Sequence, residues 1–446
     1  MINPHSGPTE NWREYQRRLQ SISRRRYLRS RLPLLGLYGV LLFSLIAAIV
    51  LSGPWIFAHL SPKPSPPGPE TVARDEGPER LLRQDLPGLL GPLRPGRLGD
   101  VTAFTLDAGG ETLRVETTLD AGLQSYIESL LGRSLTHQAA VVALDPVDGR
   151  ILAMASYSGE GGGSPENLCL KGSYPAASLI KIVAAAAAIE ARGFTPDKQL
   201  TYQGRRYTLY KKQLEQVKKG RYTNEISFRQ AFSSSINPVF GKIGIYHLGE
   251  AVLEEYASKF LFNAAIPLEL PLAPSRIDVP PDDFGLAEIA SGFNKRTLIS
   301  PIHACLIAAT VANDGVMMTP WMIRRIHDAG GREIYLADIE PLANPITAST
   351  ASLMKELMQD TVEHGTCRRT FRTLTKKKAF QEVDIGAKTG TINDPQDRYK
   401  FDWLSAYVLP RDGRRPLCLT VLAVHGKKLG IRAKNLARYI LEHRYG

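Results

Sequence analysis

Apolar residues gather first in one long segment near the start of the chain. Residues 32–58 contain no Asp, Glu, Lys or Arg and are rich in Leu, Ile, Val and Ala. This length is sufficient to cross a bilayer as a helix, and Trp55 stands near its end, where interfacial aromatic residues are common. The pattern predicts a single transmembrane helix over residues 32–58. A cleaved signal peptide is the alternative, although the apolar run is longer than a typical signal core.

Beyond this segment, strand-like and helix-like patterns alternate. Residues 101–107 and 111–117 alternate in polarity around a pair of glycines and predict a β-hairpin. Residues 137–144 and 150–157 predict a second pair of strands, and residues 121–131 predict a helix before it. The main part of the chain is therefore expected to mix helices with strands.

The clearest helix pattern begins at Ser178 and runs through an alanine-rich stretch to a stop at Gly193. A serine in the first turn lies near the positive end of the helix dipole. Lys181 is three residues on, so its amine falls on the same helical face as the Ser178 hydroxyl. The apolar residues around Lys181 should desolvate the amine and lower its pKa, as a lysine base requires. Ser178 and Lys181 are therefore candidates for a nucleophile and its base.

One Ser-x-x-Lys motif is a weak indication, because it occurs by chance and alanine-rich helices are usually core. Two further motifs follow in order. Ser235-Ile236-Asn237 begins 57 residues after Ser178 (235 − 178), and Lys388-Thr389-Gly390-Thr391 begins 153 residues later (388 − 235). Together they form the motif set of penicillin-binding proteins and serine β-lactamases. From about residue 113 to its C-terminus, the chain resembles the transpeptidase family of penicillin-binding proteins. Other stretches also resemble that family: residues 115–124, 139–154, 312–320, 363–366 and 388–403.

The resemblance implies an α+β fold of the penicillin-binding protein and serine β-lactamase type. Its central antiparallel sheet is packed by helices, and an all-helical lobe is inserted between the first and last motifs. The expected order is a cytoplasmic Arg-rich tail (1–31), the transmembrane helix (32–58), a Pro-rich extracytoplasmic linker (59–99) and the transpeptidase domain (100–446). The stretch before this domain is too short for a glycosyltransferase domain or a large pedestal. We therefore expect a monofunctional member on a short stalk, with a separate glycosyltransferase as a candidate partner.

The resemblance also implies roles for the first two motifs. Ser178 would attack the acyl-D-alanyl carbonyl of a peptidoglycan stem peptide, and neutral Lys181 would take its proton. Ser235 would relay that proton to the leaving D-alanine, while Asn237 would orient Lys181 and bind a substrate amide. Without the other motifs, Ser-x-Asn would be interpreted as a helix cap.

The third motif is expected to bind the substrate. Lys388 would supply positive charge for the terminal carboxylate of the donor, and Thr389 a hydroxyl for the same group. Gly390 has no side chain to obstruct an edge strand that pairs with the substrate backbone. By resemblance, the backbone N–H groups of Ser178 and Thr391 form the oxyanion hole. The chain departs from the family at residues 179–180, which are bulkier, and at 290–294, where members typically have Gly-Gln-Gly.

The net charge of +12 does not require a nucleic-acid partner. Eight arginines and two glutamates in residues 1–31 give +6, half of the excess. Arginines that precede a transmembrane helix place the N-terminus in the cytoplasm. The expected location is therefore the cytoplasmic membrane, with the catalytic domain on the periplasmic, extracytoplasmic side.

No metal or cofactor is implied. The nine histidines include no His-Glu-x-x-His, and the four cysteines lack Cys-x-x-Cys spacing. Buried thiols are the expected state of these cysteines. Residues 194–223 are polar, with tyrosines among lysines and arginines. They predict a solvated hairpin, with a surface on the substrate side as the alternative.

Two other functions remain open. A related hydrolase, either a D,D-carboxypeptidase or a β-lactamase, shares the motifs, but no convincing copy of the deacylating glutamate motif of class A β-lactamases follows Ser235. A non-catalytic scaffold or β-lactam sensor could retain the fold, yet the complete motif set argues against it. A membrane-anchored D,D-transpeptidase inhibited by β-lactams is the favoured interpretation.

Overall fold

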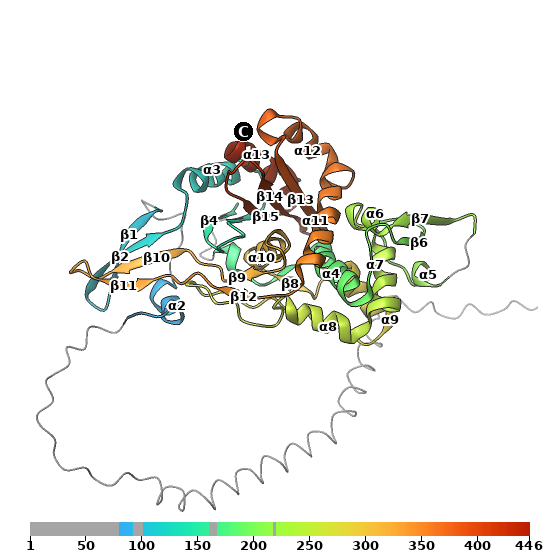
Figure 1. Ribbon diagram of the computed structural model, residues 1–446, viewed down its shortest axis with the longest axis horizontal. Coiled ribbons are helices and arrows are strands. Elements are labelled where there is room, and N and C mark those ends of the chain that lie inside the picture. Colours follow the sequence, from blue (N-terminus) through green and yellow to red (C-terminus); the bar gives the residue numbers. More distant parts are fainter. Residues whose placement is uncertain (1–79, 92–100, 160–166, 217–219) are drawn as a thin grey trace, which may run out of the picture. The chain divides into compact units, whose positions relative to one another are not determined.

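The computed structural model describes residues 80–91, 101–159, 167–216 and 220–446 (Figure 1). These residues belong to one compact unit, Gly77–Gly446. The predicted tail (1–31), the predicted transmembrane helix (32–58) and residues 59–79 and 92–99 of the predicted linker (59–99) lie outside the described residues. Within the described ranges, no helix has the length and apolarity needed to cross a membrane.

A five-stranded antiparallel sheet forms the centre of this unit. Its order is β13-β14-β15-β3-β4, so β13 is an edge strand. The strands are β3 (Gln138–Leu144), β4 (Ile151–Ser158), β13 (Val383–Asn393), β14 (Lys400–Pro410) and β15 (Leu417–His425). The predicted strands over 137–144 and 150–157 are β3 and β4. The mixed α+β fold with a central antiparallel sheet is therefore confirmed.

The sheet is buried on both faces because successive side chains of a strand point to opposite sides. In β3, Val142 belongs to one core cluster and Val141 to the other. The Val141 face is covered by α3 (Ala121–Gly132) and α13 (Ala433–Tyr445). The Val142 face packs on α10 (Pro301–Ala312). The helix predicted over 121–131 is α3.

The remaining helices lie mainly in a lobe inserted between β4 and β13. The larger ones are α4 (Lys181–Arg192), α6 (Phe228–Ser233), α7 (Asn237–Ile243), α8 (Gly249–Lys259), α9 (Asp283–Ser291), α11 (Ala348–Glu363) and α12 (Arg368–Thr375). The expectation of an all-helical lobe is wrong in one respect. Strands β6 (Gln199–Gln203) and β7 (Thr223–Ser227) pair as a hairpin within it. The hairpin predicted over residues 194–223 is therefore present, but its second strand runs on to Ser227 and Tyr202 in its first strand is buried.

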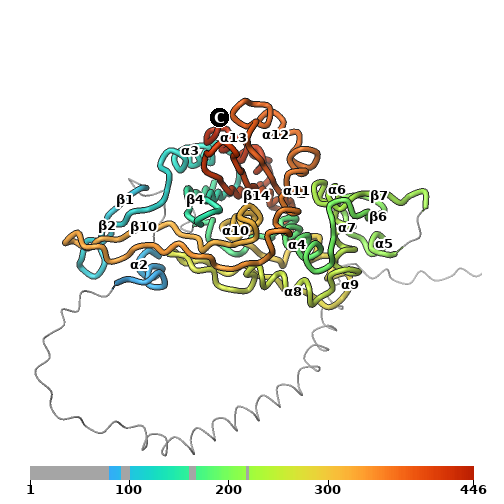
Figure 2. The backbone as a smooth tube through the Cα atoms, viewed as in Figure 1, coloured from blue at the N-terminus to red at the C-terminus, as the bar shows by residue number. Residues whose placement is uncertain are grey.

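A second antiparallel sheet stands apart from the first (Figure 2). The predicted hairpin is present as β1 (Ala103–Ala108) and β2 (Glu111–Thr117). The third strand of this sheet, β10 (Ile323–His327), comes about two hundred residues later in the sequence and pairs with β2. Strand β11 (Glu333–Leu336) pairs with β10. The shorter pairs are β5 (Tyr174–Pro175) with β8 (Leu298–Ile299), and β9 (Met317–Met318) with β12 (Pro341–Ala343).

Residues 80–91, which fall within the predicted linker (59–99), contain folded elements. Helix α2 (Leu86–Leu90) follows a short 3-10 turn, and Leu86 and Leu90 are fully buried. The backbone N–H of Leu81 donates to the Ile334 carbonyl in β11 (2.8 Å). Residues 80–91 are therefore part of the compact unit. The remaining short helix, α5 (Lys211–Leu214), lies between β6 and β7.

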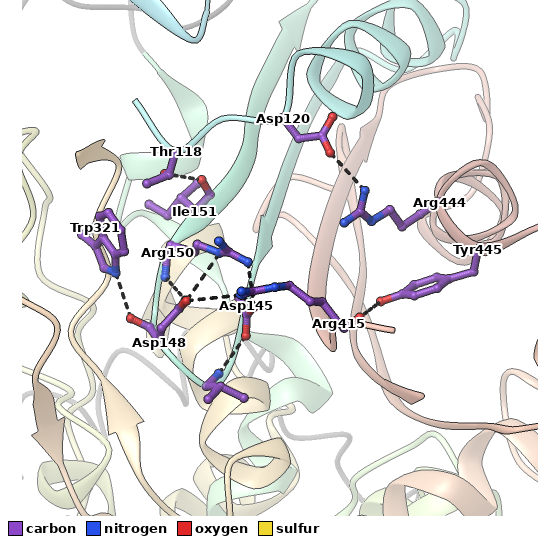
Figure 3. A network of polar contacts seen from close by, with 11 residues as sticks. Thr118, Asp120, Asp145, Asp148, Arg150, Ile151, Trp321, Arg415, Arg444 and Tyr445 are labelled. Atoms are coloured by element: carbon purple, nitrogen blue, oxygen red, sulfur yellow. Dashed lines mark hydrogen bonds and ion pairs between the residues drawn. The ribbon is translucent and has the colours of Figure 1, made fainter. Parts of the chain in front are cut away.

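A network of ion pairs supports the turn between β3 and β4 (Figure 3). The buried Asp145 carboxylate lies 3.2 Å from Arg150 and 3.3 Å from Arg415, which precedes β15. The indole N–H of Trp321 donates to the Asp148 carbonyl (2.8 Å). This network joins the central sheet to the segment that enters β10.

Candidate active site

The first motif lies where a 3-10 turn, Ala177–Ile180, continues directly into α4. Ser178 is in this turn, as predicted, and Gly193 ends the helix with a left-handed φ of 61°. Upstream of the turn, the indole N–H of Trp403 donates to the Pro175 carbonyl (2.9 Å). The turn that carries Ser178 is therefore attached to the central sheet through β14.

Lys181 brings the first two motifs together. Its amine lies 2.9 Å from the Ser178 hydroxyl and 2.8 Å from the side-chain oxygen of Asn237. It also donates to the backbone carbonyl of Ser291, at the end of α9. Lys181 is fully buried, and desolvation lowers the pKa of its amine well below 10.5, with a further contribution from the charge of Lys388. The amine can therefore lose its proton at a lower pH than an exposed lysine.

Ser235 and Lys388 form a second contact in the same site. The Lys388 amine donates to the Ser235 hydroxyl (2.9 Å) and to the Thr389 carbonyl (3.0 Å). Lys388 is fully buried too, and desolvation lowers its pKa to about 7. The Lys388 amine thus contacts Ser235 directly. The spacing of the motifs in the sequence did not indicate this contact. Ser235 holds a positive φ of 54°, which is uncommon for serine.

The third motif lies on β13, the edge strand, and passes very close to the Ser178 turn. A Cβ atom added at Gly390 would lie 3.3 Å from the Ser178 backbone nitrogen and 3.3 Å from the Ala177 Cβ. These separations are tighter than most Cβ contacts, so a larger residue would displace the strand or the turn. Glycine therefore sets the distance between Ser178 and β13.

The hydroxyls of the two threonines in the motif make hydrogen bonds to different residues. Thr389 shares a hydrogen bond with the hydroxyl of Thr366, in the turn after α11 (2.7 Å). The Thr391 hydroxyl donates to Asp402 on β14 (3.1 Å). Arg432 donates to both oxygens of that carboxylate (2.6 and 3.0 Å). Burial raises the pKa of Asp402, but the nearby His425 ring (3.7 Å) and the hydrogen bonds from Arg432 outweigh it and hold the pKa far below 3.8.

Three contributors were not identified from the sequence. The Ser291 carbonyl acts through its backbone, which no side-chain motif can reveal. Gly292 holds a φ of 67°, and a Cβ there would lie 2.0 Å from the Ala177 carbonyl oxygen. Both residues fall in the stretch that departs from the family pattern. Thr366 falls in residues 363–366, which resemble the family, but the sequence did not indicate its contact with Thr389.

No metal-binding group was found in the described ranges, where no three His, Cys, Asp or Glu side chains come close enough to hold an ion. All four cysteines lie in these ranges, and each is a buried free thiol, as predicted. The polar groups around Ser178 are hydroxyls, amines, amides and carbonyls. Such groups can perform acid–base and nucleophilic chemistry.

Residues 139–442 match the penicillin binding protein transpeptidase domain family. The chain belongs to this family. The match includes all three motifs and ends within α13. The expected family membership is therefore confirmed, and the site described above is the region in which its motifs meet.

Similar proteins include the peptidoglycan D,D-transpeptidase PbpA of Mycobacterium tuberculosis, 27% identical over 303 residues. This alignment covers 60% of the present chain and 59% of the relative. PbpA of Mycolicibacterium smegmatis is 24% identical over 317 residues, covering 64% of this chain and 62% of the relative. The chain thus matches only about three-fifths of the length of these relatives.

Solved structures of the same fold include the D,D-transpeptidase domain of a peptidoglycan glycosyltransferase from Eggerthella lenta. Its TM-score is 0.60 at 20% identity, and the alignment covers 74% of this chain and 82% of that one. The imipenem acyl-enzyme complex of penicillin-binding protein A from M. tuberculosis has a TM-score of 0.61 at 23% identity, with 74% and 79% covered. These likenesses confirm the fold.

Proposed function

We propose that this protein is a peptidoglycan D,D-transpeptidase that crosslinks stem peptides through a Ser178 acyl-enzyme. One observation carries the proposal: the Ser178 hydroxyl lies 2.9 Å from a fully buried lysine amine whose pKa is strongly lowered. A serine is a weak nucleophile until a base accepts its proton. Family membership and the names of the PbpA relatives support the same reaction.

The contacts of Lys181 suit a base. A neutral amine has two N–H donors and one lone pair. The side-chain oxygen of Asn237 and the Ser291 carbonyl can each accept one N–H, which leaves the lone pair for the Ser178 hydroxyl. The proton of Ser178 moves to Lys181 as its oxygen bonds to the donor carbonyl carbon.

The attack of Ser178 gives a tetrahedral intermediate. Its collapse breaks the D-alanyl-D-alanine amide bond. The leaving nitrogen needs a proton, and we assign its relay to Ser235, which accepts a hydrogen bond from the Lys388 amine. D-Alanine departs, and the acyl group remains as an ester on Ser178. An amine from a second stem peptide then attacks the ester, gives up a proton to the same groups and frees Ser178.

The edge strand β13 is the proposed substrate platform. The absent side chain at Gly390 keeps the strand against the Ser178 turn, so the backbone N–H groups of Ser178 and Thr391 can serve as the oxyanion hole. Thr389 is assigned to the terminal carboxylate of the donor. Lys388 contributes its charge through Ser235 and the Thr389 carbonyl.

A hydrolase is the second candidate, because water could take the place of the acceptor amine. The PbpA relatives are transpeptidases by name, which favours transfer. A non-catalytic scaffold would not need the buried lysine base, and a β-lactam sensor that is only acylated would form no transfer product. β-Lactams are proposed as inhibitors that acylate Ser178, as the imipenem complex of the M. tuberculosis neighbour suggests by analogy.

The proposed location is the cytoplasmic membrane. Residues 32–58 would anchor the chain with residues 1–31 in the cytoplasm and the catalytic unit on the extracytoplasmic side. A separate glycosyltransferase would supply the glycan strands, as a partner in the same membrane. These assignments rest on the sequence pattern alone.

The test is intact-mass spectrometry of the full-length protein in detergent, mixed with benzylpenicillin and followed over time. We expect a persistent adduct of one antibiotic, which Ser178→Ala abolishes. Adding an acceptor amine to protein acylated by a peptide donor should give the transfer product. An adduct that disappears quickly while antibiotic is consumed would indicate a β-lactamase, and no adduct on the wild type would refute the proposal.

A further inference from the structure

The terminal carboxylate of the donor needs a positive charge that a ligand can reach. The motif pattern assigned this charge to Lys388, but the Lys388 side chain is fully buried, and its amine donates to Ser235 and to the Thr389 carbonyl. Burial also lowers the pKa of Lys388 to about 7, which weakens it as a permanent cation at neutral pH. A second cation near Thr389 would therefore serve the carboxylate better.

Lys434 is placed near Thr389. It lies in the first turn of α13, and its amine donates to the backbone carbonyl of Thr366 (3.3 Å). The hydroxyls of Thr366 and Thr389 share a hydrogen bond (2.7 Å), so one residue separates Lys434 from the threonine assigned to the carboxylate. Lys434, Thr366 and Thr389 are all partly exposed, in contrast to Lys388. These three residues therefore lie where the site is open to solvent.

The charge of Lys434 is not balanced by a carboxylate of the protein. Among the described residues, no Asp or Glu pairs with its amine, which is held by the Thr366 carbonyl. An ammonium group has three N–H donors, so two remain after the bond to Thr366. A ligand carboxylate can accept from these donors while the amine keeps its contact with the backbone.

The neighbouring cation, Arg432, is engaged elsewhere. Its guanidinium donates to both oxygens of Asp402 (2.6 and 3.0 Å), and the Thr391 hydroxyl donates to the same carboxylate (3.1 Å). The pair of Arg432 and Asp402 has no net charge, and Thr391 has used its only hydroxyl proton. Lys434 thus carries an unmatched charge next to a matched pair.

The thiol of Cys367 indicates that Lys434 and Lys388 lie near the same point. Burial raises the pKa of this thiol to about 12, and the positive charges of Lys434 and Lys388 oppose the rise. Charges act strongly only at short range, so both amines lie close to Cys367, which directly follows Thr366. The region around Thr366 therefore has two lysines, one buried and one partly exposed.

We propose that Lys434 binds the terminal carboxylate of the donor stem peptide, together with the hydroxyl of Thr389. The assignment rests on the proposed transpeptidase function and names a residue that selects donors with a free carboxylate. The Thr366 carbonyl holds the amine in place, and its remaining N–H groups make charge-assisted hydrogen bonds to the carboxylate. Lys388 then serves Ser235 rather than the carboxylate.

The experiment compares two donors that differ in the charge of the last residue. Full-length protein in detergent is supplied with a stem-peptide ester ending in D-alanyl-D-lactate, or with the same ester as its terminal amide. Release of D-lactate or of D-lactamide is followed by mass spectrometry and gives kcat/KM for acylation. The ratio of the two values is the carboxylate preference of a variant, in which changes that affect both donors equally cancel.

We expect the wild type to prefer the carboxylate donor. Lys434→Gln should lower kcat/KM about tenfold for this donor and change it less than about twofold for the amide donor, because the charge is lost but an N–H donor remains. Lys434→Arg should retain the preference. Lys376→Gln is the matched control. It removes an exposed lysine at the end of α12, which packs on α13, and should change neither value.

Equal losses with both donors in Lys434→Gln would overturn the assignment, because they would show that Lys434 only supports Thr366. A wild type without a carboxylate preference would overturn it too, as would a preference that Lys434→Gln leaves intact. Lys434→Met, which keeps the apolar part of the side chain, is a second neutral variant if the glutamine variant fails to fold. If the wild type releases neither product, the proposed function fails; if it releases both but Lys434 does not affect the preference, only this assignment fails.

Discussion

Two polar clusters of this molecule deal with charge in opposite ways. Around the β3–β4 turn, the buried carboxylate of Asp145 is matched by Arg150 and Arg415 (Figure 3). Around Ser178, two lysine amines are fully buried, and among the described residues the charge that shifts the pKa of Lys181 is the like charge of Lys388. The first cluster balances its charges, whereas the second leaves them unbalanced.

The difference teaches which cluster stabilises the fold and which serves a reaction. A buried charge with matched partners is stabilised by them, and breaking the match destabilises the protein. A buried amine without a counterion resists protonation, which makes it available as a base. The cluster around Ser178 therefore favours reactivity, whereas the cluster around the β3–β4 turn favours stability. Replacing residues in each cluster should separate the two properties.

The largest effect is expected for Lys181→Met, which removes the proposed base but keeps a long apolar side chain. Acylation by benzylpenicillin should slow by roughly 10³-fold. The free energy of unfolding should change by less than about 1 kcal/mol, because relief of the desolvated amine offsets the hydrogen bonds lost by Asn237 and the Ser291 carbonyl. Stopped-flow acylation and urea unfolding measure the two quantities. A variant both slow and clearly less stable would show that Lys181 is a structural group.

Asp145→Asn should have the converse effect. The amide keeps the shape of the side chain but loses the charge that matches Arg150 and Arg415, which should lower the free energy of unfolding by about 2 kcal/mol. Acylation should proceed at the wild-type rate, since Asp145 does not contact the site. Urea unfolding and acylation kinetics on the same preparation provide the measurement. A large loss of acylation would mean that the two clusters are coupled.

Lys388→Met should change the pH dependence of acylation. The proposed base must be neutral, so acylation rises with pH as Lys181 loses its proton, with a midpoint well below 10.5. The charge of Lys388 contributes to this lowering, and its removal should move the midpoint to higher pH. The pH profile of the second-order acylation rate reports the midpoint, whatever the absolute rate. A midpoint that stays in place would assign the lowered pKa to burial alone.

The smallest effect is expected for Thr366→Val, which removes the hydroxyl partner of Thr389 with little change in shape. Thr389 would then be less well oriented, and acylation should slow by roughly threefold. Thr366→Ser retains a hydroxyl and serves as the control. Equal rates for the two variants would show that the contact with Thr389 does not matter for acylation.

Local patterns predicted much of this fold. Period-two alternation found β1 and β2, the apolar runs found β3 and β4, and the alanine-rich stretch found α4, although Ser178 lies in the 3-10 turn that leads into this helix. These features depend on residues close together in the sequence. The pairing of β2 with β10 joins segments about two hundred residues apart, and no local pattern contains that information.

The site was predicted in the same uneven way. Motif order identified Ser178, Lys181, Ser235 and Asn237 together with the Lys-Thr-Gly strand, because their side chains carry the chemistry. The Ser291 carbonyl was missed because every residue has one, so only the fold can single it out. The contact between Lys388 and Ser235 was missed because a rotamer decides where a long side chain ends.

The four buried thiols have a consequence for how the protein matures. Burial raises the pKa of Cys169, Cys305 and Cys367 to about 12, so the folded chain presents hardly any reactive thiolate at neutral pH. Thiol–disulfide exchange requires thiolate, and only the unfolded chain supplies it. If this domain folds outside the cytoplasm, as proposed, the time spent unfolded there sets the exposure to wrong crosslinks. Rapid folding would then protect the protein from oxidative misassembly.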